Sequence, residues 1–175
     1  MVFPVLNIFG KEISENDLNS ITMKKQIIFL LVSFISLTGF AQNESKRIKQ
    51  FNLERNIALK GYDPVAYFKQ GKAVKGKKEL TSTFEGVIYN FSSVVNKEFF
   101  IKNPSSYEPQ YGGWCAFAMG DSAEKVDINP ETFKIIVGKL YLFYNAYFNN
   151  TLKSWNKNQP GLKAKADANW KKIIQ

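Results

Sequence analysis

Residues 107–120, Tyr-Glu-Pro-Gln-Tyr-Gly-Gly-Trp-Cys-Ala-Phe-Ala-Met-Gly, form the stretch around which we predict the fold. The stretch contains Met119 and the only cysteine of the chain, Cys115. Pro109 and the pair Gly112-Gly113 precede a dense run of Trp, Cys, Ala and Phe, an order typical of a flexible entry into a buried element. We therefore expect Cys115 to lie in the wall of a packed core, and we place any chemical site here.

Strand and helix patterns alternate on both sides of this stretch. Residues 80–84 and 87–91 flank Glu85-Gly86, and residues 132–137 and 140–144 flank Gly138-Lys139, which predicts two β-hairpins. Helices are expected from Pro64 behind the cap Asp63, over 93–102, over 145–158 and over 162–174. The sequence therefore predicts a small single α+β domain with two hairpins and about four helices.

Apolar spacing predicts which side of each helix is buried. In the helix over 93–102, the expected buried residues are Val95 and Phe99, with Phe100 as a further candidate. In the helix over 145–158, they are Tyr147, Phe148, Leu152 and Trp155. Pro160-Gly161 is expected to end that helix, and Trp170 to anchor the last one.

The N-terminal part has the pattern of an export signal. Met23-Lys24-Lys25 precedes an apolar run, and Ala41-Gln42 follows it. We expect residues 23–41 to be a signal peptide, cleaved after Ala41, that directs the protein to the periplasm or the extracellular space. A transmembrane anchor is the alternative, and no membrane span is expected after cleavage. Residues 1–22 are then an over-extended start, 42–56 a polar tether and 57–175 the folded domain.

Composition excludes several kinds of site. The chain has 175 residues, a net charge of +9, no histidine and one cysteine. Histidine-based catalysis, a cysteine-clustered zinc site and an intramolecular disulfide are therefore excluded. The lysines are scattered and no nucleic-acid motif is present, so we expect a solvated basic surface and no nucleic-acid partner.

Several motifs, taken together and in order, resemble the exported single-domain branch of the YHS domain family. The matching stretches are Gly-Tyr-Asp-Pro-Val-Ala-Tyr-Phe at 61–68, Phe-Glu-Gly-Val-Ile-Tyr-Asn-Phe-Ser-Ser at 84–93, Tyr-Gly-Gly-Trp-Cys-Ala at 111–116, Gly-Lys-Leu-Tyr-Leu at 138–142 and Ala-Asp-Ala-Asn-Trp at 166–170. The resemblance covers residues 59–170 and implies a small α+β module.

In its metal-associated members, the YHS family has cysteines that are linked to heavy-metal handling. At the matching positions this chain has Ala66, Ser92 and Asn96, and the histidine of the family name is also missing. Soft metals select thiolate ligands, so the resemblance does not extend the family's metal role to this chain. The exported branch implies no settled activity.

Candidate ligand-binding residues gather around two short segments. They are Tyr62, Asp63, Tyr111, Gly112, Gly113, Trp114 and Cys115. Each also has a structural interpretation: Asp63 as a helix cap, the glycines as a tight bend, and the aromatic residues and Cys115 as core.

Cys115 and Met119 are four residues apart and would share one face of a helix, where a thiolate and a thioether can hold Cu(I). Copper is therefore the one candidate cofactor, and the alternative is that both side chains are core residues.

Three functions remain open at this point. The first is a non-enzymatic exported module that binds a small molecule or a soft metal ion. The second is a thiol-based redox protein or enzyme that uses Cys115, which would need activation by something other than histidine. The third is a structural or partner-binding protein of the cell envelope that uses its basic face.

Overall fold

The computed structural model describes residues 19–20, 22–26 and 44–175, and the chain divides into two compact units, residues 1–41 and 42–175. The predicted signal peptide lies outside the described residues except for its first four positions, which belong to a helical stretch over 22–26. In the part of the chain that the structure describes, no helix has the length and apolar character needed to cross a membrane.

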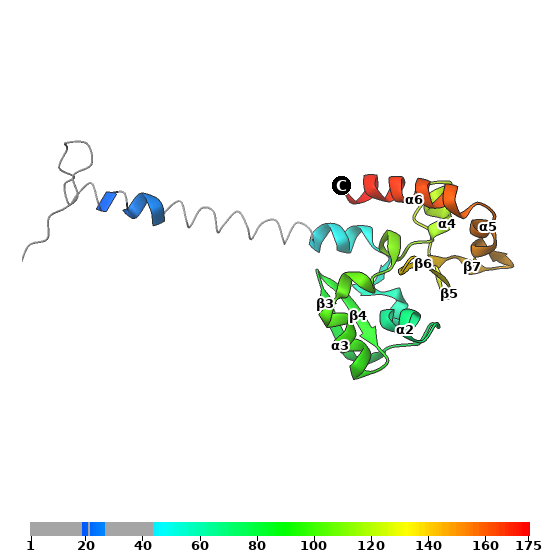
Figure 1. The fold of residues 1–175 in the computed structure, drawn as a ribbon, viewed down its shortest axis with the longest axis horizontal. Helices are drawn as coiled ribbons and strands as arrows, with labels where there is room; N and C mark the ends of the chain where they lie inside the picture. The colour runs from blue at the N-terminus through cyan, green and yellow to red at the C-terminus, as the bar shows by residue number, and fades with distance from the viewer. Residues whose placement is uncertain (1–18, 21, 27–43) are drawn as a thin grey trace, which may run out of the picture. The chain divides into compact units, whose positions relative to one another are not determined.

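The folded unit contains both helices and small sheets, which confirms the α+β class (Figure 1). Its strands are β1 (Leu53–Glu54), β2 (Ile57–Ala58), β3 (Lys77–Phe84), β4 (Val87–Phe91), β5 (Asn129–Ile136), β6 (Lys139–Phe143), β7 (Asn145–Ala146) and β8 (Asn149–Asn150). Its helices are α2 (Pro64–Lys69), α3 (Val94–Lys102), α4 (Ala116–Asp121), α5 (Thr151–Lys157) and α6 (Gln159–Ile174), with short 3-10 turns over Leu59–Gly61, Pro104–Ser106 and Gln110–Gly113. One sheet has the order β1-β2-β4-β3, and β5-β6 and β7-β8 form two-stranded sheets.

We predicted a polar tether over 42–56, but its described part, residues 44–56, belongs to the fold. Residues 44–50 are helical, and Arg47 is buried with its guanidinium 4.5 Å from the centre of the Phe51 ring. Arg47 also pairs with Glu108. Because the long side chain of Arg47 can pack its stem while its charged end finds a carboxylate, a polar-looking segment is able to dock onto the domain.

The β3–β4 hairpin has the predicted turn, Glu85-Gly86, and buries Val87, Tyr89 and Phe91 completely. In the second hairpin, however, the turn is Val137-Gly138 and not Gly138-Lys139. Both turn residues have positive φ, 47° and 67°. This is the backbone geometry that a two-residue hairpin turn requires, and the sequence puts only one glycine there.

The helix predicted over 145–158 is wrong in its first part. Residues 145–150 form the β7–β8 hairpin, and α5 begins only at Thr151. Tyr147 and Phe148 have φ values of 49° and 63°, which a right-handed helix does not allow, and they are 92% and 112% exposed rather than buried. Pro160 does not break a helix, because it lies in the first turn of α6. Backbone N–H groups in the first turn have no partner within the helix, so the N–H that proline lacks is not needed there.

The buried side of α3 also differs from the prediction. Phe100 is fully buried, whereas Val95 and Phe99 are 58% and 39% exposed. Phe100 packs between the rings of Tyr89 and Phe91, at centroid distances of 4.6 and 5.2 Å. The ammonium group of Lys69 lies 4.6 Å from the centre of the Phe99 ring and covers it from the solvent side.

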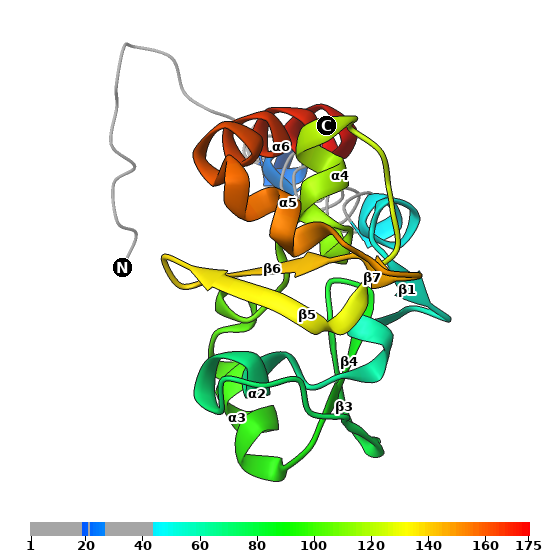
Figure 2. The same cartoon turned by 90° about the vertical axis from the view of Figure 1, so that its right-hand side faces the viewer.

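The helix–hairpin pairs α2–β3–β4 and α4–β5–β6 repeat each other. Lys77 and Asn129, the first residues of β3 and β5, are 52 positions apart, and the same spacing relates both ends of all three elements. The parallel bridge between Ile57 and Ile88 recurs at the same spacing as one between Pro109 and Leu140. Figure 2 shows the first set of elements below the second set.

Backbone conformation follows the same repeat. Every positive-φ residue between Ile57 and Ser92 has a counterpart 52 positions later: Leu59 and Tyr111, Lys60 and Gly112, Gly61 and Gly113, Gly71 and Ala123, Glu85 and Val137, Gly86 and Gly138. We call residues 57–107 the first repeat and residues 109–162 the second repeat.

After the hairpins the spacing becomes 55 positions, so that Phe100 corresponds to Trp155 and Lys102 to Lys157, the last residues of α3 and α5. Phe100 is fully buried against Tyr89 of β4, and Trp155 is fully buried against Tyr141 of β6. The β7–β8 hairpin accounts for the three added residues. It is therefore an insertion in the second repeat, which explains why α5 starts later than the apolar pattern predicts.

The two repeats pack directly against each other. Tyr67 of α2 lies against Phe133 of β5, with a centroid distance of 4.8 Å, and its hydroxyl donates to the Pro130 carbonyl at 3.0 Å. Burial is the main cause that raises the pKa of Tyr67 far above its usual value, with the negative charge of Asp63 adding to it. The hydroxyl therefore stays protonated and keeps this hydrogen bond across the physiological pH range.

Candidate functional site

Asp63 is fully buried and serves as a structural tie. Its Oδ1 accepts from the N–H groups of Val65 and Ala66 at 2.9 and 3.3 Å, which confirms the predicted cap of α2. Its Oδ2 accepts from the Ser92 N–H, the Ser92 hydroxyl and the Asn96 amide at 2.8, 2.6 and 2.6 Å. Five donors therefore satisfy this carboxylate, and no surface of it is open to a ligand.

Cys115 occupies the position in the second repeat that Asp63 occupies in the first. The Tyr144 N–H lies 3.3 Å from Sγ, as the Ser92 N–H lies against Asp63, and the hydroxyl of Thr151 is 3.4 Å from Sγ where Asn96 contacts Asp63. The Cys115 N–H donates to the Val126 carbonyl, matching the bond from Asp63 to Val74. The thiol is fully buried, as predicted, and acts as an apolar substitute for the carboxylate.

Cys115 and Met119 are both fully buried but belong to different clusters of core side chains. Cys115 lies with Tyr89, Phe91 and Leu142, and Met119 lies with Tyr141 and Trp155. Within the described residues, no group of three or more cysteine or carboxylate side chains is placed to hold a metal ion. Copper binding by Cys115 and Met119 therefore stays a prediction.

Tyr111, Gly112 and Gly113 form a left-handed turn with φ values of 56°, 59° and 86°. A Cβ atom on Gly112 would lie 2.7 Å from the Phe51 ring and 2.8 Å from Trp170, so glycine is needed for close packing as well as for φ. The Tyr111 hydroxyl donates to Asp167 at 2.8 Å. Burial, followed by this hydrogen bond, raises the pKa of Tyr111 well above its usual value.

Trp114 is partly buried, and its indole N–H donates to the Gln50 carbonyl at 2.6 Å. With Tyr111 and the two glycines, it fastens the helix over 44–50 and α6 onto the second repeat. None of these four residues lines either of the two cavities described next.

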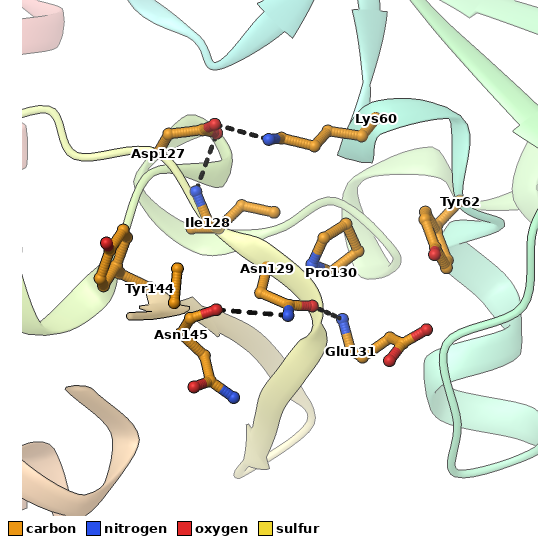
Figure 3. A pocket seen from close by; sticks show the side chains of 10 residues that line it. Lys60, Tyr62, Asp127, Ile128, Asn129, Pro130, Glu131, Tyr144 and Asn145 are labelled. Carbon is orange, nitrogen blue, oxygen red and sulfur yellow. Dashed lines mark hydrogen bonds and ion pairs between the residues drawn. The ribbon is translucent and has the colours of Figure 1, made fainter. Parts of the chain in front are cut away.

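The larger cavity has a volume of about 470 Å³ and lies between the two repeats (Figure 3). Lys60 and Tyr62 of the first repeat form one side. The second repeat supplies the rest of the lining: Asp127, Ile128, Asn129, Pro130, Glu131, Tyr144, Asn145 and Ala146. Tyr62 is the only one of the predicted ligand-binding residues that lines it.

A salt bridge between the repeats closes one end of this cavity. Lys60 Nζ lies 2.5 Å from Asp127 Oδ2, and Asp127 Oδ1 accepts from the Asn52 amide and the Ile128 N–H at 3.0 and 2.8 Å. Burial alone would raise the pKa of Asp127, but the hydrogen bonds from Lys60, Asn52 and Ile128 outweigh it and hold the pKa below its usual value. Asp127 is therefore an anion that already has its partners.

Lys60 reaches this position from a backbone that is costly for it. Leu59, Lys60 and Gly61 all have positive φ, at 56°, 51° and 76°, and only the last is a glycine. A non-glycine residue in this region loses roughly 1–2 kcal/mol relative to a right-handed conformation. Such outliers are found at binding sites more often than elsewhere, which agrees with the position of this turn at the cavity.

The second cavity, of about 340 Å³, lies on the other side of the β7–β8 hairpin. Cys115 belongs to its wall, with Tyr144, Thr151 and Asn149. Because Cys115 has no exposed surface, its thiol is out of reach of solutes in this cavity. A buried thiol without an activating cation nearby is expected to be unreactive.

The sequence analysis missed most of the lining of the larger cavity. Asp127 and Glu131 precede the predicted strand over 132–137, and Tyr144 and Asn145 lie where the predicted strand over 140–144 meets the predicted helix over 145–158. No local pattern marks these residues, since packing of one repeat on the other brings them together. The three consecutive positive φ values at Leu59, Lys60 and Gly61 mark this turn in the structure. The sequence Leu-Lys-Gly does not predict them.

Comparison with models of protein families, with curated proteins and with solved structures found no match to this chain. We therefore argue function from the contacts of the described residues.

Proposed function

We propose that this protein is an exported, YHS-like binding module without catalytic activity, and that it holds a small polar molecule in the larger cavity. The observation that carries the proposal is the cavity itself, which both repeats line and which combines two tyrosines with charged and amide side chains. Small-molecule sites in proteins have volumes of about 300–1,000 Å³ and a few converging polar groups. The volume of about 470 Å³ falls in this range.

The position of the cavity supports binding rather than a structural gap. Its walls come from the 3-10 turn at Lys60, from the start of β5, and from Tyr144 and β7, so elements of both repeats set its shape. The Lys60–Asp127 salt bridge, at one end of the cavity, joins the two repeats. A ligand that contacts both sides would therefore stabilise the packing of the repeats.

Two alternatives, thiol chemistry and soft-metal binding, have less support. A thiol-based activity needs an accessible sulfur, and Cys115 is fully buried with Tyr144 and Thr151 against it. Cys115 and Met119 are both fully buried among apolar side chains, as is usual for core residues, which favours a structural role for the pair. Export rests on the signal-peptide pattern of residues 23–41, and the resemblance to YHS domains rests on the order of the motifs between residues 59 and 170.

A screen with cavity-filling controls tests the proposal. Ligand-observed NMR on the purified protein would use a panel of small amines, carboxylates, sugars and alcohols. Ala146→Phe places a ring in the cavity, and Ala164→Phe places one on the exposed side of α6 as the matched control. We expect at least one class of compound to bind the wild type and the α6 variant but not Ala146→Phe. Binding that survives Ala146→Phe would place the site elsewhere.

A further inference from the structure

We infer that the ligand of this cavity is a small organic cation whose ammonium group donates hydrogen bonds. The inference rests on the proposed function and deepens it by naming the chemistry of the ligand. It follows from a count of which polar groups in the cavity already have partners and which do not.

The nitrogen donors described for the cavity wall each have a partner, whereas the hydroxyls of Tyr62 and Tyr144 do not. Lys60 Nζ is paired with Asp127 at 2.5 Å. The amide of Asn129 donates to the Asn145 carbonyl at 3.4 Å, and the amide of Asn145 donates to the Thr132 hydroxyl at 3.0 Å. The Glu131 N–H donates to Asn129 Oδ1 at 2.9 Å (Figure 3). A ligand that only accepts hydrogen bonds therefore finds few groups to bind.

Acceptors, in contrast, remain open. Among the described residues, no hydrogen bond or ion pair engages the Glu131 carboxylate, the hydroxyls of Tyr62 and Tyr144, or Asn145 Oδ1. A carboxylate accepts only, and a phenol oxygen accepts as well as donates. In Figure 3 the Glu131 carboxylate and Tyr62 lie on the same side of the cavity. A ligand that donates hydrogen bonds would therefore satisfy these acceptors.

The charges around the cavity favour an ammonium group over a neutral hydrogen-bond donor. Glu131 is an unpaired carboxylate, whereas the two cations nearby are engaged: Lys60 with Asp127, and Lys75 with the Lys60 carbonyl at 2.5 Å and the Tyr62 ring at 4.6 Å. An ammonium group can pair with Glu131 in a charge-assisted hydrogen bond, which is about twice as strong as a neutral one. An anionic ligand would meet Glu131 and Asp127 without a free cation.

A matched series of four compounds tests this inference. n-Butylamine, n-butyltrimethylammonium, n-butanol and n-butyrate each contain an unbranched four-carbon skeleton, counting the carboxyl carbon of butyrate, and differ in charge and in N–H or O–H donors. Binding to the purified protein is measured by saturation-transfer NMR, and relative affinities by the displacement of bound n-butylamine by each of the other compounds. We expect n-butylamine to bind at least about 10-fold more tightly than n-butanol and n-butyltrimethylammonium, and n-butyrate to bind weakest.

Two variants connect the result to the named residue. Glu131→Gln keeps the shape of the side chain and removes the charge, and it should weaken n-butylamine at least about 10-fold. Glu124→Gln removes an exposed carboxylate on the rim of the second cavity and should change nothing. Neither Glu131 nor Glu124 is buried, so we expect both variants to fold, and thermal melting checks this.

The outcomes separate the two proposals. If n-butanol or n-butyrate binds at least as tightly as n-butylamine, and Ala146→Phe abolishes that binding, the cavity binds a ligand but not an ammonium group, and the inference is overturned. It is equally overturned if Glu131→Gln leaves n-butylamine affinity unchanged. If no compound of the series or of the wider panel binds in an Ala146-dependent way, the proposed function itself fails.

Discussion

Asp63 and Cys115 hold the same position in the two repeats, yet they stabilise it by different physical means. The carboxylate of Asp63 receives five hydrogen bonds from α2, the end of β4 and α3. Among the described residues, the thiol of Cys115 has two polar partners, the Tyr144 N–H and the Thr151 hydroxyl. The comparison shows that one backbone arrangement can be held either by a buried polar hub or by a packed apolar core.

The two repeats also differ in the contacts around Asp63 and Cys115. In the first repeat, Phe68 packs on Tyr107 with a centroid distance of 5.4 Å. At the corresponding positions of the second repeat, Gly120 lies against Leu162 so closely that a Cβ atom would be 2.4 Å from the Leu162 carbonyl oxygen. Without a side chain at Gly120, α6 can approach the backbone of α4. The second repeat therefore replaces a ring pair with direct helix–helix contact.

The largest effect is expected from removing the polar hub. Asp63→Ala leaves several buried donors without an acceptor and should lower the free energy of unfolding by about 4 kcal/mol, whereas Cys115→Ala should cost about 1–2 kcal/mol. Chemical denaturation of both variants measures the difference. Equal losses would contradict the distinction between a polar and an apolar hub.

Wild-type Cys115 should also react with a thiol reagent only in denaturant.

A smaller effect is expected at the helix contact of the second repeat. Gly120→Ala forces α6 away from α4 and should cost about 3 kcal/mol. Gly138→Ala is the matched control, because nothing lies within 4 Å of its Cβ and only the φ of +67° opposes the substitution. That control should lose about 1 kcal/mol. A Gly120→Ala variant as stable as Gly138→Ala would show that α6 adjusts freely.

The β7–β8 insertion offers a change of opposite sign. Tyr147 and Phe148 are exposed and both have positive φ, a pattern for which Asn-Gly is the preferred pair. The double substitution Tyr147→Asn/Phe148→Gly should therefore raise the free energy of unfolding by about 0.5–1 kcal/mol. Thermal and chemical unfolding check this. A loss of stability would mean that the two rings have contacts in the native protein that this structure does not show.

The smallest effect concerns the salt bridge that joins the repeats. The pKa of Asp127 is lowered in the folded protein, so its contribution is present above the unfolded pKa of about 4 and is lost as pH falls through the folded value. Because the Asp127 side chain is 55% exposed, we expect less than about 1 kcal/mol. Stability curves between pH 2 and 7 should become slightly flatter in Asp127→Asn and stay unchanged in Asp121→Asn, an exposed control.

The two repeats explain how much of the fold was accessible from sequence. Seven residues are identical at the spacing of 52 positions: Gly61 and Gly113, Ala66 and Ala118, Val74 and Val126, Glu79 and Glu131, Gly86 and Gly138, Tyr89 and Tyr141, Phe91 and Phe143. These pairs are too scattered to reveal the repeat. Residues as different as Leu59 and Tyr111 share one left-handed conformation, because the surrounding structure imposes it.

The sequence by itself determined the α+β class, the β3–β4 hairpin with its buried Val87, Tyr89 and Phe91, the Asp63 cap of α2 and the burial of Cys115. Each of these depends on alternation, capping or turn chemistry within a few residues, which a single segment can express. Only the tertiary structure decided the repeat, the β7–β8 insertion and the cavity between Lys60, Tyr62 and Glu131. The repeat and the cavity depend on contacts between segments far apart in the sequence, such as Lys60 with Asp127, which no local preference encodes. The β7–β8 turn needs positive φ at Tyr147 and Phe148, which their residue types do not favour.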